Sequence, residues 1–155
     1  MDTQISYLYE LSLRRCGTIA ERNPITGPWA VKKCIEPLLV DADRELFVVL
    51  ALDARNRPIG TNIVSIGSLS ASVVHPREVF KFAILANANA LILAHNHPSG
   101  DPEPSQDDRE ITKRLQEAGT LMGIEILDHL ILGESWLSFK ERGWMWAPIK
   151  SQPSL

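Results

Sequence analysis

The sequence predicts a single α/β domain in which a mixed β-sheet is flanked by helices. Its 155 residues fall within the usual size range of one domain that can bury a core. Residues 45–52 and 90–94 are short apolar runs, too short for typical helices, and each predicts a buried strand. Residues 105–122 carry apolar side chains at helical spacing. Because such stretches alternate without a repeat or a linker, the chain fits one α/β unit.

The first third of the chain predicts an arm, a helix and a hairpin. Residues 4–15 alternate loosely between apolar and polar types, which favours an edge strand or an extended arm. Pro28 suits the first turn of a helix, whereas Pro37 obscures where that helix ends. The strand over 45–52 is followed by a polar turn and a second strand over 59–66, so the two strands are expected to pair as a hairpin.

A helix and a central strand follow. Pro76 can occupy a first helical turn, and apolar residues continue a helical face to about Asn89. This helix is expected to cover the sheet. The apolar run 90–94 predicts a central strand that carries His95 to the carboxyl end of the sheet.

The last third predicts one long helix and two strands. The helix over 105–122 is followed by glycine, which commonly ends helices. The sequence then predicts a strand over 124–132, a strand over 136–139 and a short closing turn or helix over 141–146.

Composition narrows the class of protein. The formal net charge is −3, so no general positive field attracts the chain to nucleic acid. Hydrophobic residues make up 45% of the sequence, but no run approaches the roughly 20 apolar residues that span a bilayer. The N-terminus lacks a basic segment followed by an apolar one, so we expect a cytoplasmic chain with no membrane association. Cys16 and Cys34 lack the spacing of a thiolate zinc site.

Residues 91–108 hold the clearest candidate site. Side chains alternate along a strand, so His95 and His97 are expected to point to the same side. One cation could bind both imidazoles, and Asp108 is the obvious third ligand. Two nitrogens and one carboxylate suit zinc.

Structural explanations exist for the same residues. His95 and His97 could simply be held by backbone hydrogen bonds at a strand end. The loop PSGDPEP favours a preorganised site, because proline and glycine fix its backbone shape. Ser105 and Asp108 also have the spacing of a helix capping box. The capping box and the metal site are compatible, because the cap would hold Asp108 facing the loop.

The segment HNHPSGDPEPSQDD resembles the JAMM signature, HxH followed by seven residues and SxxD, in the form found in the RadC family of the JAMM/MPN superfamily. The segments VVHPREVF and ILDHLILG resemble that family too, and the likeness runs from about Ala30 to Trp144. We therefore expect a JAMM/MPN (cytidine-deaminase-like) fold over 30–147, an N-terminal extension or edge strand over 1–29, and a flexible tail over 148–155. The chain looks like a short RadC form, or an isolated catalytic domain, without the helix-hairpin-helix region that usually lies upstream.

The resemblance implies a set of roles. Zinc would be bound by His95, His97 and Asp108, with water as the fourth ligand. Glu45, at the start of a predicted strand, matches the upstream glutamate of JAMM sites and would act as the general base. Alternatively, Glu45 is simply an exposed acid at a strand end. Ser105 would donate a hydrogen bond to the oxyanion.

Two functions follow from these observations. The first is a zinc-dependent metallohydrolase that cleaves a peptide or isopeptide bond in a peptide or protein substrate. The alternative is a RadC-like protein of DNA repair or recombination that binds or acts on DNA, with repair proteins as partners. The acidic net charge favours the first. An oligomer is compatible with either, and His129 is expected to make structural hydrogen bonds rather than to bind the metal.

Overall fold

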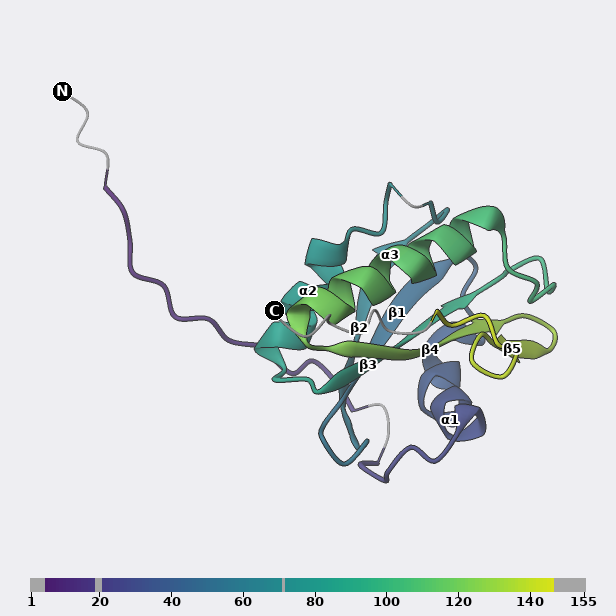
Figure 1. Ribbon diagram of the computed structural model, residues 1–155, viewed down its shortest axis with the longest axis horizontal. Coiled ribbons are helices and arrows are strands. Elements are labelled where there is room, and N and C mark those ends of the chain that lie inside the picture. Colours follow the sequence, from purple (N-terminus) through teal and green to yellow (C-terminus); the bar gives the residue numbers. More distant parts are fainter. Residues whose placement is uncertain (1–4, 19–20, 71, 147–155) are drawn as a thin grey trace, which may run out of the picture.

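The computed structural model describes residues 5–18, 21–70 and 72–146. They contain three helices and a five-stranded sheet (Figure 1). In chain order the elements are α1 (Pro28–Leu39), β1 (Leu46–Leu52), β2 (Pro58–Ile66), α2 (Pro76–Leu85), β3 (Ala90–Asn96), α3 (Gln106–Met122), β4 (Glu125–Leu132) and β5 (Trp136–Ser138). Among these residues, no helix combines the length and the apolar character needed to cross a membrane.

The sheet is mixed, as predicted, with strand order β2-β1-β3-β4-β5. β1 pairs with β2 as the expected antiparallel hairpin, and it also pairs antiparallel with β3. β3 and β4 run parallel, because α3 carries the chain back across the sheet between them. The carboxyl ends of β3 and β4 therefore meet the amino end of β1 at one end of the sheet.

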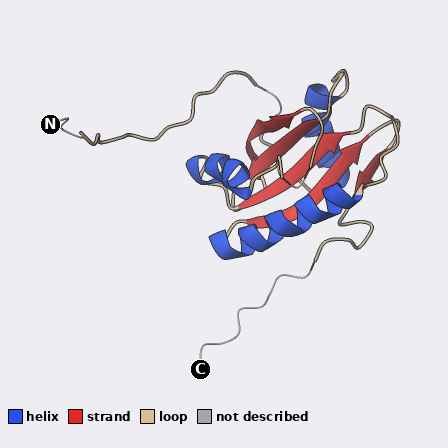
Figure 2. Ribbon diagram, turned by 90° about the horizontal axis from the view of Figure 1, so that it is seen from above, coloured by secondary structure: helices blue, strands red, loops and turns tan. Residues whose placement is uncertain are grey.

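Helices cover both faces of the sheet (Figures 1 and 2). Along β1, Val48 and Leu50 pack with α1, whereas Phe47 and Val49 pack with α2 and α3. This division follows from the alternation of side chains along a strand. β3 lies in the middle of the sheet and is buried along its whole length, which explains its unbroken apolar sequence before His95. The predicted single domain of α/β class is confirmed.

One detail of the predicted elements is wrong. α2 ends at Leu85 rather than near Asn89, because Asn87 takes a left-handed backbone conformation with φ of 53° that a helix cannot continue. Of the short closing turn or helix predicted over 141–146, the structure has the turn.

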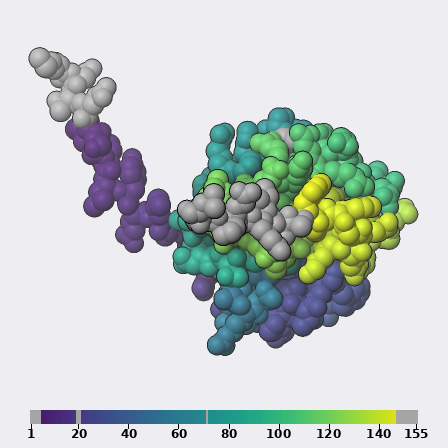
Figure 3. Space-filling model, viewed as in Figure 1, coloured from purple at the N-terminus to yellow at the C-terminus, as the bar shows by residue number. Residues whose placement is uncertain are grey.

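The N-terminal segment lies away from the body of the protein. Residues 5–18 form neither helix nor strand and are exposed (Figure 3). Of the two predicted alternatives, these residues therefore form the extended arm and not the edge strand. The tail expected over 148–155 lies outside the described residues.

Candidate metal centre

His95 and His97 come from the end of the central strand. His95 lies in β3 on the face covered by α3 and has no exposed surface. His97 follows the strand, and its backbone N–H donates to the Leu132 carbonyl at 2.7 Å. The two side chains share one side, as predicted, with their Nε2 atoms 2.9 Å apart.

The loop after β3 holds the ring of His97. Its Nδ1 lies 2.7 Å from the Asp101 carbonyl, which can only accept a hydrogen bond, so Nδ1 donates. The loop is packed closely against the turn after β4, where a side chain at Gly133 would collide with the Gly100 carbonyl. Gly100 itself has φ of 90°, which favours glycine. The PSGDPEP loop is therefore held in place, which orients His97.

Asp108 is held by the first turn of α3. The Ser105 Oγ accepts from the Asp108 N–H at 3.0 Å, and the Asp108 Oδ2 accepts from the Ser105 N–H at 2.8 Å. This is the predicted capping box. Asp108 is 3% exposed, so the box fixes a buried carboxylate.

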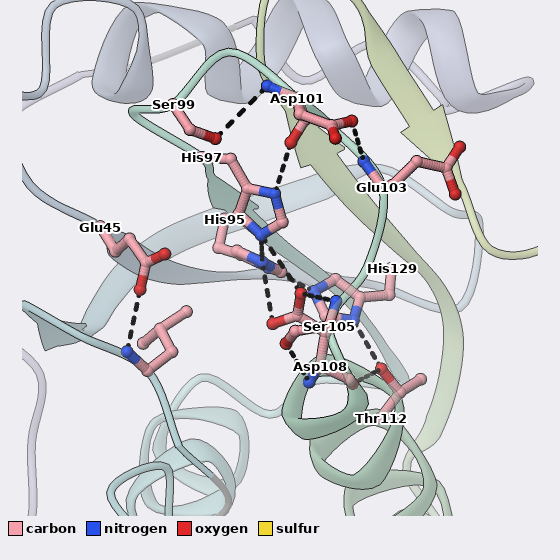
Figure 4. Close-up of polar contacts among 11 residues, drawn as sticks. Glu45, His95, His97, Ser99, Asp101, Glu103, Ser105, Asp108, Thr112 and His129 are labelled. Carbon is pink, nitrogen blue, oxygen red and sulfur yellow. Dashed lines mark hydrogen bonds and ion pairs between the residues drawn. The ribbon is translucent and has the colours of Figure 1, made fainter.

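The three side chains converge on one point (Figure 4). Asp108 Oδ1 lies 3.2 Å from His95 Nε2, and Asp108 Oδ2 lies 3.2 Å from His97 Nε2. These donor atoms lie within 4.8 Å of one another and could hold a metal ion. Ligands about 2.0–2.1 Å from a tetrahedral zinc stand roughly 3.3 Å apart, so the observed spacing fits such an ion.

The charges of the cluster are coupled. Burial disfavours the ionised form of Asp108, but its contacts with the His95 and His97 rings outweigh this effect and hold the pKa of Asp108 well below its usual range. The hydrogen bond to Asp108 raises the pKa of His97 above its ordinary value, although burial opposes this. Burial lowers the pKa of His129 well below its ordinary value. Without metal, Asp108 therefore favours a proton on His97.

Metal binding is expected to strengthen as pH rises through the raised pKa of His97. A metal and a proton compete for His97 Nε2, so below this pKa each bound ion must displace a proton, and above it the affinity should level off. Calorimetry at a series of pH values, in two buffers of different ionisation enthalpy, measures both the affinity and the protons released. A zinc affinity that does not change between pH 6 and 8 would contradict this coupling.

Glu45 lies beside the cluster and is not one of its three ligands. In the pairing of β1 with β3, Phe47 stands opposite His95, and Glu45 and His97 each lie two residues beyond this pair at the same end of the sheet. The Asn96 side chain accepts from the Leu46 N–H at 2.7 Å and donates to the Arg44 carbonyl at 2.8 Å. Both neighbours of Glu45 are thereby fixed.

The Glu45 side chain is half-buried, and its Oε2 accepts from the Leu69 N–H at 2.9 Å. Figure 4 shows its carboxylate to one side of the two histidines, away from Asp108. Its negative charge also contributes to the raised pKa of His97. The alternative of an exposed acid at a strand end does not describe this half-buried side chain.

The sequence interpretation missed two contributors. They are Asn96, which holds the backbone on both sides of Glu45, and Thr112, which contacts His129. Thr112 lies one helical turn after Asp108 on the same face, and this spacing could have revealed it. His129 makes hydrogen bonds, as predicted, and they connect His95 with Thr112.

Comparison with known proteins identifies the family of this chain. Residues 25–144 match the profile of the RadC-like JAB domain. The chain belongs to the RadC family. A UPF0758 protein of Symbiobacterium thermophilum is 51% identical over 134 residues, which cover 86% of this chain and 57% of that protein. A UPF0758 protein of Rubrobacter xylanophilus is 49% identical over 140 residues, covering 88% of this chain and 61% of that protein.

Another UPF0758 protein, from Desulfitobacterium hafniense, is 54% identical over 123 residues, covering 79% of this chain and 54% of that protein. This RadC-like chain thus spans somewhat more than half the length of the curated relatives it matches. The family match contains the whole candidate centre, from Glu45 to His129. The names of these relatives state no activity.

Proposed function

We propose that this RadC-like chain is a zinc-dependent hydrolase that cleaves peptide or isopeptide bonds. The observation that carries the proposal is the convergence of His95, His97 and Asp108 on one point, with Glu45 beside them. Two imidazole nitrogens and one carboxylate are typical of catalytic zinc, which leaves a fourth position for water. The proposed substrate is a peptide or protein.

In the proposed mechanism, His95, His97 and Asp108 hold the ion. When bound, zinc would lower the pKa of a coordinated water towards about 7 and polarise the substrate carbonyl. Glu45 takes a proton from the attacking water and passes it to the leaving nitrogen. The water oxygen bonds to the carbonyl carbon, and the C–N bond breaks.

We propose that Ser105 donates a hydrogen bond to the oxyanion, and its hydrogen bonding in the structure is compatible with this role. The Asp108 N–H uses a lone pair of Ser105 Oγ, which leaves the hydroxyl proton available for another acceptor. A donor to the developing oxyanion contributes about 2.7–4 kcal/mol in other enzymes.

Removal of zinc is expected to abolish peptide cleavage, and its return to restore it. The probe is a library of proteome-derived peptides together with an isopeptide-linked pair of peptides, and mass spectrometry detects newly formed termini. The zinc-loaded protein should generate them, whereas protein dialysed against a chelator should not. Addition of one equivalent of zinc to the dialysed protein should recover the same cleavage sites.

The same preparation separates the two classes of function. Binding to a short DNA duplex is measured at 50 and 200 mM salt. Strong, salt-sensitive binding without any peptide cleavage would favour the DNA-associated class and refute the proposal. The net charge of −3 favours weak binding to DNA.

A further inference from the structure

A buried polar chain runs from His95 away from the metal position (Figure 4). His95 Nδ1 lies 2.7 Å from His129 Nε2, and His129 Nδ1 lies 2.6 Å from Thr112 Oγ1. The chain ends where Thr112 Oγ1 meets the Asp108 backbone carbonyl at 2.7 Å. His95, His129 and Thr112 have no exposed surface, so water does not replace these contacts.

The last hydrogen bond of this series, from Thr112 to the Asp108 carbonyl, determines where each proton lies. A backbone carbonyl only accepts, so the single hydroxyl proton of Thr112 is donated to Asp108. Thr112 Oγ1 must then accept from His129 Nδ1–H. A neutral, buried His129 with its proton on Nδ1 has a lone pair on Nε2, which accepts from His95 Nδ1–H. The Nε2 of a neutral His95 is thereby left as a lone pair.

We propose that Thr112 and His129 are positioning residues that fix the tautomer of His95, so that its Nε2 lone pair faces the metal position. This inference rests on the metal site of the proposed function. His97 is held in the same tautomer without an intervening residue, because its Nδ1–H donates directly to the Asp101 carbonyl. Both imidazoles are thus prepared to bind through Nε2. Partners of this kind orient a ligating histidine and make it more basic.

Two aromatic rings hold His129 in the required orientation. Phe139 stacks on its ring at 4.8 Å and 25°, and Phe47 meets it edge-on at 5.7 Å and 73°. A half-turn of the imidazole would place ring carbons where its nitrogens now meet His95 and Thr112, and this packing opposes such a turn. The proton order is therefore set by the fold as well as by Thr112.

The first test measures tautomers in the wild-type protein. Long-range ¹H–¹⁵N NMR spectra of the zinc-free protein, recorded at a pH where the histidines are neutral, should show His95 and His129 as Nδ1–H tautomers. Zinc should shift the Nε2 resonance of His95 to a position typical of a metal-bound nitrogen. The Nε2 resonance of His129 should stay typical of a nitrogen that does not bind metal. A proton on Nε2 of His129 would overturn the inference.

The second test replaces the hydroxyl of Thr112 with a methyl group. Thr112→Val has nearly the same shape, but it leaves His129 Nδ1–H without an acceptor and favours the other tautomer of His129. That tautomer would donate to His95 and place a proton on the ligating nitrogen. Zinc affinity, measured by chelator competition, is expected to fall about 10–100-fold.

Two matched variants control for the substitution itself. Thr112→Ser keeps the hydroxyl and should retain zinc affinity close to wild type. Thr120→Val removes the same kind of bond, to the Gln116 carbonyl at 3.0 Å, from an exposed position of the same helix, and should change nothing. Wild-type zinc affinity in Thr112→Val would refute the role of Thr112.

The tests of the positioning role can succeed or fail independently of the test of the proposed hydrolase. If Thr112→Val does not fold, the wild-type tautomers still decide the inference. Wild-type protein that shows the expected tautomers and binds zinc, yet cleaves no peptide, would refute the hydrolase and leave the positioning role supported.

Discussion

Glu45→Gln is expected to lower the rate of peptide hydrolysis by about 10²–10⁴-fold while the protein keeps its zinc. Glutamine has nearly the same shape, and its amide oxygen can still accept from the Leu69 N–H, so the strand end should remain in place. It cannot take up a proton from water. Cleavage kinetics on the peptides identified with the wild type, together with zinc content, measure the two effects.

Glu125→Gln is the matched control for this variant. Glu125 is an exposed acid at the start of β4, where it pairs with Ala90 at the opposite end of the sheet. The control removes the same charge and should cleave at the wild-type rate. If Glu45→Gln cleaved as fast as the control, another residue would have to be the base. Loss of zinc would instead mean that Glu45 contributes to binding the ion.

Asp108→Asn is expected to abolish stoichiometric zinc binding. An amide has no charge to offset the cation, so zinc affinity should fall by more than the roughly 10–100-fold typical of changes around a metal site. Asparagine can still accept from the Ser105 N–H, so the helix cap should survive better than in Asp108→Ala, where loss of a cap costs about 1 kcal/mol. Metal analysis after dialysis measures the zinc retained.

Asp107→Asn provides the comparison for Asp108→Asn. Asp107 is an exposed acid in the same first turn of α3, so its replacement removes a similar stabilisation of the helix N-terminus. It should retain one zinc per chain. A full complement of zinc in Asp108→Asn would show that the ion is not held by this cluster.

The parts of the site that were predictable depend on local geometry. His95 and His97 share a side because side chains alternate along a strand, and Ser105 and Asp108 form a cap because their spacing matches one helical turn. These rules act over a few residues, and the structure agrees with both. The central strand was predictable because a short apolar run identifies a buried strand, and the hairpin because a polar turn joins two strand segments.

Other parts depend on contacts between segments far apart in sequence. Glu45 lies 50 positions before His95, and only the antiparallel register of β1 with β3 brings its end of the strand to the histidines. The resemblance to JAMM proteins identified Glu45, whereas spacing alone did not. The end of α2 was misplaced because the left-handed conformation of Asn87 interrupts a helical pattern.

The sequence by itself determined the class of fold, the three metal-ligand candidates and the cap that holds Asp108, because strand and helix periodicities fix which neighbouring side chains share a face. Only the tertiary structure decided which distant groups complete the site. The parallel pairing of β3 with β4 and the packing of α3 over them bring His129 and Thr112 behind His95. A proton order across three segments arises from the folded chain, since no local rule specifies it.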